Sequence, residues 1–522
     1  MLARSIAVFA ALVPVCCFSQ APQADPNSST SPSEQKIQFY FDQRVRTEDW
    51  NNIFDFNGAP GALNDDQREQ MRYRTMFWVS IPVTSSIDFV TGINQETDQK
   101  LGNVGASVTP KPTRFDEIVF DKMYFDFKKL PVKGLNLRVG RQNLAEGEGF
   151  ILFEGTPGDG SRTTYFNAVN LSYTRAHSKL ELLGILDPSQ DRFLPDINSQ
   201  HKVLNDWDDK AVGAYYTDKN HSKTQFETYY FYKKEVNDKF NSLIGPWADI
   251  TSSQEPLSFN LQPDRHISTF GGRVVQLITP TLTATGEFAY QWGAQHARPE
   301  EVPLAGQGAM LAANFPAPIA GYLLNQPMSA LPAQTIQSWG GYGYLKKQFT
   351  GKWKPYVKAG YWVMSGSDPN KPTVDGNWDP IFSRWPEWSE LYLYSQVMEL
   401  GVGYTTNTRQ FQGEVGIQPS DKLKLRATYY RMDAFYPYKA PYIDAPGLGL
   451  TSIGTAAFGN GTHRGDLFET RLDYIINKDF SGHITAECML PGNFYLTPSA
   501  ALFLQAEISY RLHFASGHMP KL

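Results

Sequence analysis

The chain has 522 residues, a formal net charge of −5, and aromatic residues at 14% of its positions. The slightly acidic balance argues against a nucleic-acid-binding protein, which needs a basic face. A mean hydropathy of −0.39 is polar for a helical membrane protein, yet the chain contains 27 Tyr, 33 Phe and 11 Trp. This combination is typical of a membrane β-barrel, in which polar lumen residues offset an apolar outer band and aromatic side chains mark both interfaces.

The N-terminus has the parts of a secretory signal peptide. Arg4 precedes an apolar run at 6–18, and Ser19-Gln20-Ala21 places small residues at the −3 and −1 positions of a cleavage site. The run is too short for a membrane-spanning helix, which needs about 20 apolar residues. We therefore expect a signal peptide over residues 1–21, with cleavage after Ala21.

The next stretch, 22–35, is rich in Pro, Ser and Gln and has the composition of a flexible leader. Cleavage leaves Cys488 as the only cysteine of the mature chain, so no intrachain disulfide can form. A lipid anchor on Cys16 is the alternative reading of the N-terminus. Val15 argues against it, because a small residue is needed before a lipidated cysteine.

Apolar and polar residues alternate with a period of two along most of the mature chain. Segments with this pattern are 37–46, 71–81, 423–430, 468–476 and, longest of all, 502–514. A long strand that is apolar on one face and charged on the other suits a barrel wall with lipid outside and water inside. Strands of soluble sandwiches usually have only about five or six residues. The pattern predicts an all-β fold, a transmembrane antiparallel β-barrel over 36–514, with a tail at 515–522.

Short turns alternate with long polar connections. The short turns are expected at 82–84, 217–220, 279–281, 350–351, 419–421 and 477–479. The long connections are expected at 47–70, 96–116, 143–162, 187–208, 235–264, 293–335, 365–407 and 433–462. Outer-membrane barrels have this asymmetry, with the short turns on the periplasmic side and the long loops outside.

The alternation yields about 19 candidate strands, but termini that share the periplasmic side require an even number. The weakest candidate is 395–406, because it contains Gly401 and Gly403 and follows a loop rich in Trp and Pro. We assign it to a loop, which leaves about 18 strands. Barrels of this size enclose an aqueous channel.

The polar positions of these segments carry charges of both signs. By parity, the arginines that face the lumen are Arg44, Arg46, Arg72, Arg74, Arg138, Arg273, Arg426, Arg471 and Arg511. The acidic residues expected there are Asp42, Asp126, Glu181, Glu227, Glu287, Glu414, Glu469, Asp473, Glu487 and Glu507. Guanidinium groups bind carboxylates with paired hydrogen bonds, so such a wall suits an anionic solute. Ion pairs that brace neighbouring strands are the competing role.

Arg141 is an exception to the alternation of outward apolar and inward charged residues, because it shares a face with the lipid-facing Val139. A charge at the bilayer midplane costs roughly 2–4 kcal/mol, so we expect Arg141 at the extracellular end of its strand or turned inward by a bulge. With Arg162, it is a candidate for a constriction if 146–161 folds into the channel. A salt bridge to Glu146, Glu148 or Asp159 is the alternative.

Catalytic and metal-binding signatures are weak. The sequence has no Gly-x-Ser-x-Gly, His-Glu-x-x-His, Cys-x-x-Cys or phosphate-binding glycine loop, and its nine histidines are scattered. An acidic cluster at Asp206, Asp208 and Asp209 suits calcium or, alternatively, a solvated loop. We expect no enzyme, no cofactor and no resident metal.

Three motifs occur in series between residues 121 and 162. Asp121–Phe127 is followed by Leu137–Gln142, which contains Gly-Arg-Gln, and by Gly155–Arg162, which contains Asp-Gly-Ser-Arg. This series closely resembles the core signature of the alginate-export family of outer-membrane barrels. Supporting matches lie at 44–50, 378–382 and 491–495. The resemblance covers 36–514, and the tail beyond Phe514 departs from it.

The resemblance implies a monomeric barrel of about 18 strands whose basic lumen passes a polyanionic sugar. We therefore expect an outer-membrane channel for an anionic oligo- or polysaccharide. Its candidate pathway residues are Arg44, Arg72, Arg74, Asp126, Arg138, Arg141, Arg162, Arg426 and Arg471. The alternatives are an uptake porin for small polar or anionic solutes, an outer-membrane enzyme, and a secreted carbohydrate binder. Expected partners besides the solute are the lipid bilayer with its lipopolysaccharide and the barrel-assembly machinery, but no nucleic acid.

Overall fold

The computed structural model describes most of the chain after its N-terminal segment. The described residues are 36–53, 56, 68–101, 114–153, 166–188, 191, 193–195, 197, 208–236, 264–297, 332–383, 389–394, 405–438 and 458–516. The expected signal peptide, the leader and the tail from 517 onward lie outside this part. Within it, no helix is long and apolar enough to cross a membrane.

Nearly all regular structure is β-strand. The first nine strands are β1 (Gln38–Asn51), β2 (Arg68–Thr84), β3 (Ile87–Lys100), β4 (Arg114–Phe127), β5 (Leu135–Gln142), β6 (Phe166–Thr174), β7 (Ser178–Asp187), β8 (Asp208–His221) and β9 (Thr224–Val236). The others are β10 (Arg265–Thr279), β11 (Leu282–Gln295), β12 (Gln334–Gln348), β13 (Tyr356–Met364), β14 (Val374–Asp375), β15 (Thr408–Ser420), β16 (Leu423–Asp433), β17 (His463–Ile475), β18 (Phe480–Pro491) and β19 (Ala501–Ala515). The short helix α4 spans Glu390–Tyr394.

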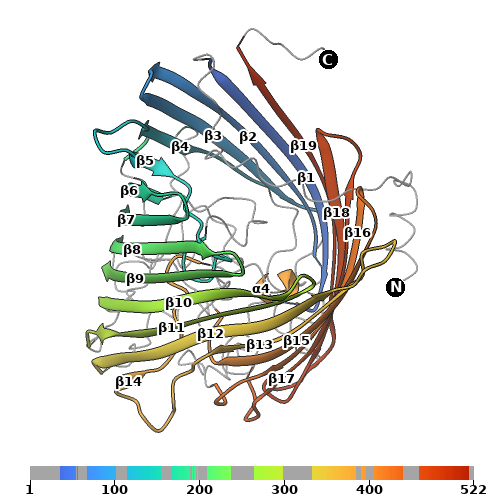
Figure 1. Cartoon of the computed structure of the whole chain (residues 1–522). Helices are drawn as coiled ribbons and strands as arrows, with labels where there is room; N and C mark the ends of the chain where they lie inside the picture. The colour runs from blue at the N-terminus through green and yellow to red at the C-terminus, as the bar shows by residue number, and fades with distance from the viewer. Residues whose placement is uncertain are drawn as a thin grey trace, which may run out of the picture.

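The sheet closes on itself. Each long strand pairs antiparallel with the next along the chain, and β1 pairs with both β2 and β19, from Gln38 opposite Ala515 to Asn51 opposite Leu502. The two-residue β14 pairs parallel with the edge of β12 and is not part of the wall. Eighteen of the nineteen described strands therefore form a closed barrel (Figure 1). The predicted fold class and strand number are confirmed.

The rejected strand candidate lies between β13 and β15, which pair directly with each other. Residues 395–404 of that candidate lie outside the described residues. The wall is complete without them, because β13 and β15 keep an unbroken register from Tyr356 opposite Gly416 to Met364 opposite Thr408.

The wall has an inverted distribution of polarity. Val212, Phe288 and Val415 on the outer face are 53–59% exposed, whereas Arg46 and Gln505 on the inner face are fully buried. A soluble β-protein places its apolar residues inside and its charges outside. Here the alternation has the opposite sense, which is stable only if hydrocarbon surrounds the wall.

The long connections lie at one end and the short turns at the other. The end with short turns also holds the start of β1 and the end of β19, as predicted for the periplasmic side. The turn expected at 217–220 is displaced, because β8 continues to His221 and turns at 222–223. Asp218 and Asn220 resemble turn residues, but tertiary pairing with β9 extends the strand beyond them.

Assembly should depend on the apolar contact that ends the closing strand pair. Phe514 faces Phe39 in register, and their rings stack with centroids 5.1 Å apart. Replacing Phe514 by Asp puts a carboxylate on the lipid side of this pair, so heat-modifiable barrel should fall below about half of the wild-type amount. Phe514→Tyr, which keeps the ring, and deletion of 517–522 should both assemble normally. Normal assembly of the aspartate variant would contradict this role.

Candidate transport pathway

The predicted inward arginines lie on the inner face of the wall, and carboxylates accompany most of them. The ion pairs between neighbouring strands are Arg46–Glu507 (2.7 Å), Arg72–Glu48 (3.3 Å), Arg74–Asp42 (3.4 Å), Arg138–Asp126 (3.0 Å), Arg273–Glu227 (2.8 Å), Arg426–Glu469 (3.0 Å) and Arg511–Asp42 (2.8 Å). We call these pairs the arginine ladder. They satisfy charges that are removed from bulk water, and they link adjacent strands through side chains.

Two other predicted arginines also have acidic neighbours. Arg471 contacts Asp473 of its own strand at 2.8 Å, and the Nε of Arg44 lies 3.6 Å from Glu507. Arg162 lies outside the described residues. The ladder and these contacts balance most of the positive charge on the wall.

Arg141 lies elsewhere than in the expected constriction. It is next to the last residue of β5, in register with Asn167, and shares the outer face with Val139. Its guanidinium donates to the side-chain oxygen of Asn167 (3.0 Å) and to the carbonyl oxygen of Phe120 (2.9 Å). It also pairs with Asp191 at 2.7 Å, a partner not among the three that were considered. The side chain therefore braces a loop on the outer wall.

The pKa of Asp191 reflects this pairing. Partial burial would raise the pKa, but the hydrogen bond and the charge of Arg141 outweigh it and hold the pKa below its usual value. Asp191 is therefore ionised at neutral pH, where its charge pair with Arg141 holds the described residues around it against the outer wall.

The first part of the β5–β6 connection folds into the barrel, as expected for 146–161. Residues 154–161 of that range are not described, but Leu144, Phe150 and Leu152 pack inside against the wall. Glu148 accepts hydrogen bonds from Arg273 and Tyr344, each at 2.7 Å. We call residues 143–153 the first inner loop.

A second inner loop, residues 365–383, meets the first. Leu152 and Phe382 form a parallel bridge, and the Phe153 amide donates to the Phe382 carbonyl at 3.2 Å. Trp378 stacks on Phe150 with ring centroids 5.0 Å apart. Lys233 of β9 donates to the carbonyl of Ile381 at 3.1 Å. The two loops form one apolar body that narrows the interior on the side of β6–β13.

The opposite side of the interior holds α4 (Figure 1). The Glu487 carboxylate accepts a hydrogen bond from the Ser389 hydroxyl and from the amides of Glu390 (3.1 Å) and Leu391 (3.3 Å), which satisfies the first turn of the helix. Arg464 donates to the Tyr392 hydroxyl at 2.6 Å. The interior is thus narrowed from two sides.

Basic side chains that the candidate set omitted line the remaining wall. Lys346 of β12 and Lys358 of β13 are direct partners in register. Lys424 and Arg426 share the inner face of β16, across β15 from β13. We call the three lysines, Lys346, Lys358 and Lys424, the lysine wall. The alternation that predicts inward-facing arginines also predicts that these lysines face inward, but only arginines were considered as pathway residues.

Aromatic rings lie between the cations of the lysine wall. The ammonium of Lys358 is 4.4 Å from the ring centre of Tyr344 and 5.5 Å from that of Trp362. The ammonium of Lys346 is 4.5 Å from the ring centre of Tyr356. These distances are typical of cation–π contacts. Trp362, Tyr356 and Lys358 are buried, at 2%, 7% and 8% exposed. The side chains that remain open to the interior here are Lys346, Lys424 and the half-buried Tyr344.

The acidic cluster considered for calcium or for a solvated loop is only partly described. Asp206 lies outside the described residues, and Asp209 is buried and pairs with Lys233 at 3.0 Å. No group of three metal-binding side chains occurs in the described part of the chain.

A closed antiparallel barrel with an apolar exterior, long loops at one end and a charged interior defines an outer-membrane channel protein. The sequence model described as alginate export matches residues 61–501, and the chain belongs to this family. No curated protein matches the chain in sequence.

Solved structures share the fold at low sequence identity. The outer membrane protein OpdK from Pseudomonas aeruginosa is 9% identical, with a TM-score of 0.50 over 92% of this chain and 99% of that one. OccAB4 of Acinetobacter baumannii is 10% identical, with a TM-score of 0.50 over 93% and 100%. OccK2 (OpdF) of P. aeruginosa, solved in complex with glucuronate, is 10% identical, with a TM-score of 0.50 over 92% and 98%. These matches show the fold alone.

The docking of the first inner loop should depend on pH. Glu146 reaches down to Lys179, next to a periplasmic turn, and burial together with a shared hydrogen bond to Glu181 raises the pKa of Glu146 to about 9. A raised pKa means that docking is fully favourable at low pH and is lost as the pH rises through about 9. Single-channel conductance should therefore increase above that pH.

The matched variants are Glu146→Gln and Glu69→Gln. The first imitates the protonated acid and should make the conductance independent of pH between neutral and about pH 10. The second changes an exposed glutamate of β2 and should keep the wild-type profile. A wild-type profile in Glu146→Gln would show that this carboxyl does not control the loop.

Proposed function

We propose that this barrel passes an anionic oligo- or polysaccharide across the outer membrane. The observation that carries the proposal is the lysine wall with its aromatic rings. Carboxylates of a uronate chain suit the ammonium groups of Lys346 and Lys424, and the apolar face of a sugar ring suits the half-buried Tyr344. Membership of the alginate export family supports the same solute class.

The lysine wall differs from the arginine ladder in its surroundings. No ion pair joins the ammonium of Lys346 or Lys424 to a carboxylate in the described part of the chain. Asp473 faces Lys424 in register, but its carboxylate accepts a 2.8 Å hydrogen bond from Arg471. Glu414 faces Lys358 in register and accepts a 2.6 Å hydrogen bond from Tyr356. The positive charge that carboxylates leave unpaired along the described route therefore lies mainly on Lys346 and Lys424, while the ladder is close to balance.

The candidate pathway residues have a secondary part in this proposal. Arg44, Arg74, Arg138 and Arg426 line the inner face and contribute hydrogen-bond donors. Asp126 holds Arg138 in place at 3.0 Å. Arg72 and Arg471 serve mainly as braces. We further infer that the chain reaches the membrane through signal peptide 1–21 and the barrel-assembly machinery, and that it acts as a monomer.

A second candidate function is uptake of small polar or anionic solutes. The observation that favours it is the apolar body formed by Phe150, Trp378 and Phe382, because a packed loop pair narrows the route. A single polysaccharide chain and a small organic acid differ mainly in length. Both would meet the lysine wall, so its charge does not separate these two functions.

The reconstituted channel should prefer anions. The preference should weaken between about 0.1 M and 1 M salt, as the Debye length falls from about 10 Å to about 3 Å. Replacing Lys346, Lys358 and Lys424 together by Ser should bring the anion-to-cation permeability ratio close to one. The measurement is the reversal potential in a salt gradient.

The control is Lys210→Ser with Lys234→Ser, which removes two positive charges from the outer face of β8 and β9. This variant should keep the wild-type selectivity, because its charges are separated from the route by the wall. A cation-selective wild type, or unchanged selectivity in the triple variant, would refute the anion pathway.

Chain length should separate export of a polymer from uptake of small acids. For a polyanion route, an oligouronate should block the current at least about tenfold more strongly than a neutral oligosaccharide of equal length, because several carboxylates bind at once. The triple lysine variant should lose this difference. Rapid entry of glucuronate in liposome swelling, without any block by the longer chain, would favour the small-solute porin instead.

A further inference from the structure

The outer face of the wall carries a row of basic side chains close to the long loops. Lys210 of β8 and Lys234 of β9 are direct partners in register, and His266 of β10 is the next partner of Lys234. The alternation places them on the same face as the exposed Val212 and Tyr232. All three basic residues lie near the extracellular ends of their strands.

The two lysines have no charged partner among the described residues. Within the described residues, no hydrogen bond or ion pair reaches the ammonium of Lys210 or Lys234. Asp209 points inward and pairs with Lys233 at 3.0 Å. Asp208 and Asp218 share the outward face of β8, and Asp208 is two residues from Lys210. Like charges directly opposite each other destabilise a strand pair, so a bound anion would stabilise this one.

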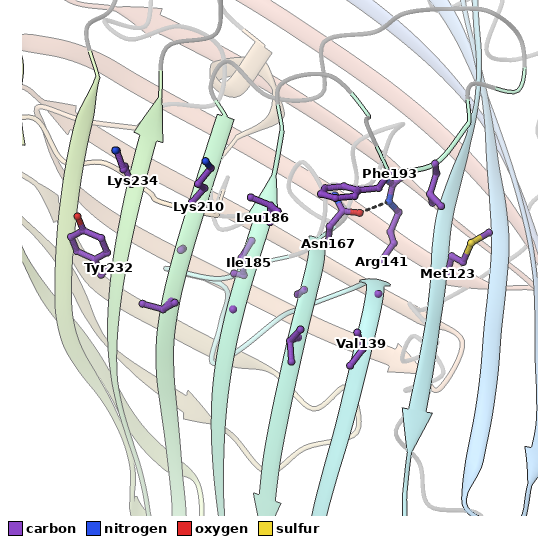
Figure 2. A pocket seen from close by; sticks show the side chains of 17 residues that line it. Met123, Val139, Arg141, Asn167, Ile185, Leu186, Phe193, Lys210, Tyr232 and Lys234 are labelled. Atoms are coloured by element: carbon purple, nitrogen blue, oxygen red, sulfur yellow. Dashed lines mark hydrogen bonds between the residues drawn. The ribbon is translucent and has the colours of Figure 1, made fainter.

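An apolar groove of about 780 Å³ adjoins this row (Figure 2). Its floor includes Gly184 of β7, where a Cβ atom would have no neighbour within 4 Å. Val169 and Val212 flank Gly184 on the adjacent strands. Phe193, from the loop after β7, lines the end of the groove near the loops. With about 780 Å³ of space and an apolar floor, the groove suits a hydrocarbon chain.

The contact between Arg141 and Asp191 builds the loop side of the groove. The Asp191 carboxylate accepts hydrogen bonds from the amides of Phe193 (3.1 Å) and Leu194 (3.2 Å) and pairs with Arg141 at 2.7 Å. The loop is thereby held against the outer wall with Phe193 and Leu194 at the groove. A charge pair in the protein thus positions apolar side chains where they meet lipid.

We propose that this outer face binds a phosphorylated glycolipid of the outer leaflet. Its phosphates lie on Lys210 and Lys234, and one acyl chain follows the groove over Gly184. The occupant is an amphiphile, because cations at headgroup height adjoin an apolar groove at hydrocarbon depth. Two adjacent ammonium groups suit phosphate esters better than a zwitterionic headgroup. The inference depends on the membrane location and not on which solute the channel passes.

The test is native mass spectrometry of the detergent-purified barrel with added bis-phosphorylated lipid A. Wild-type protein should retain one bound lipid. Lys210→Ser with Lys234→Ser should weaken binding at least about tenfold, since each surface cation contributes roughly fivefold toward an anionic headgroup. Gly184→Leu should also weaken it while leaving both charges in place, because the new side chain fills the groove.

The matched control is Lys219→Ser with Lys223→Ser, which removes two exposed lysines at the periplasmic ends of the same strands. It should bind lipid A like wild type. Heat-modifiable migration should show that every variant folds, because all the changed side chains lie on the surface.

Three results would overturn the site. One is unchanged binding in the Lys210/Lys234 variant, and another is an equal loss in the Lys219/Lys223 control, which would indicate charge attraction without a site. The third is equal binding of lipid A that lacks its phosphates. Displacement of the lipid by inorganic phosphate alone would contradict the part assigned to the acyl chain.

Discussion

Hydrocarbon offers no partner to a backbone N–H or C=O group, so a sheet in a membrane cannot have a free edge. This chain meets that constraint by pairing its first and last strands over their full length, Gln38–Asn51 with Leu502–Ala515. Every other property of the wall follows from closure. Once the sheet is a ring, alternate side chains must face either lipid or the interior, and the sense of the alternation is fixed for all strands together.

Closure also explains why charge is abundant inside. Inward side chains are screened from lipid and partly from bulk water, so the interior tolerates arginine and glutamate only where they satisfy one another. The arginine ladder meets this need between neighbouring strands, as in Arg74–Asp42 and Arg426–Glu469. Because its charges nearly cancel, the arginine ladder stabilises the wall but adds little to the electrostatic potential of the interior. The net positive potential of the interior therefore depends on the few cations that contact aromatic rings, such as Lys346 beside Tyr356.

The period-two pattern was enough to predict the barrel, its strand number and the inward face of residues such as Arg44 and Arg138, because each depends only on local alternation. The inner loops were harder. The partners of Glu148 lie on β10 and β12, and no local pattern links such distant positions. Arg141 shows the same limit: its place near the end of β5 could be expected from the cost of a buried charge, but its partner Asp191 comes from another loop.

The bridge between Leu152 and Phe382 joins loops whose own strands stand on different parts of the ring. Such a contact has a large sequence separation, and it can form only after the intervening wall from β6 to β13 exists. The two connections are neighbours only because eight strands of wall bring them together. The width of the passage therefore depends on the geometry of that wall as much as on the sequences of the loops, and a change in strand register between β6 and β13 would alter the passage without touching either loop.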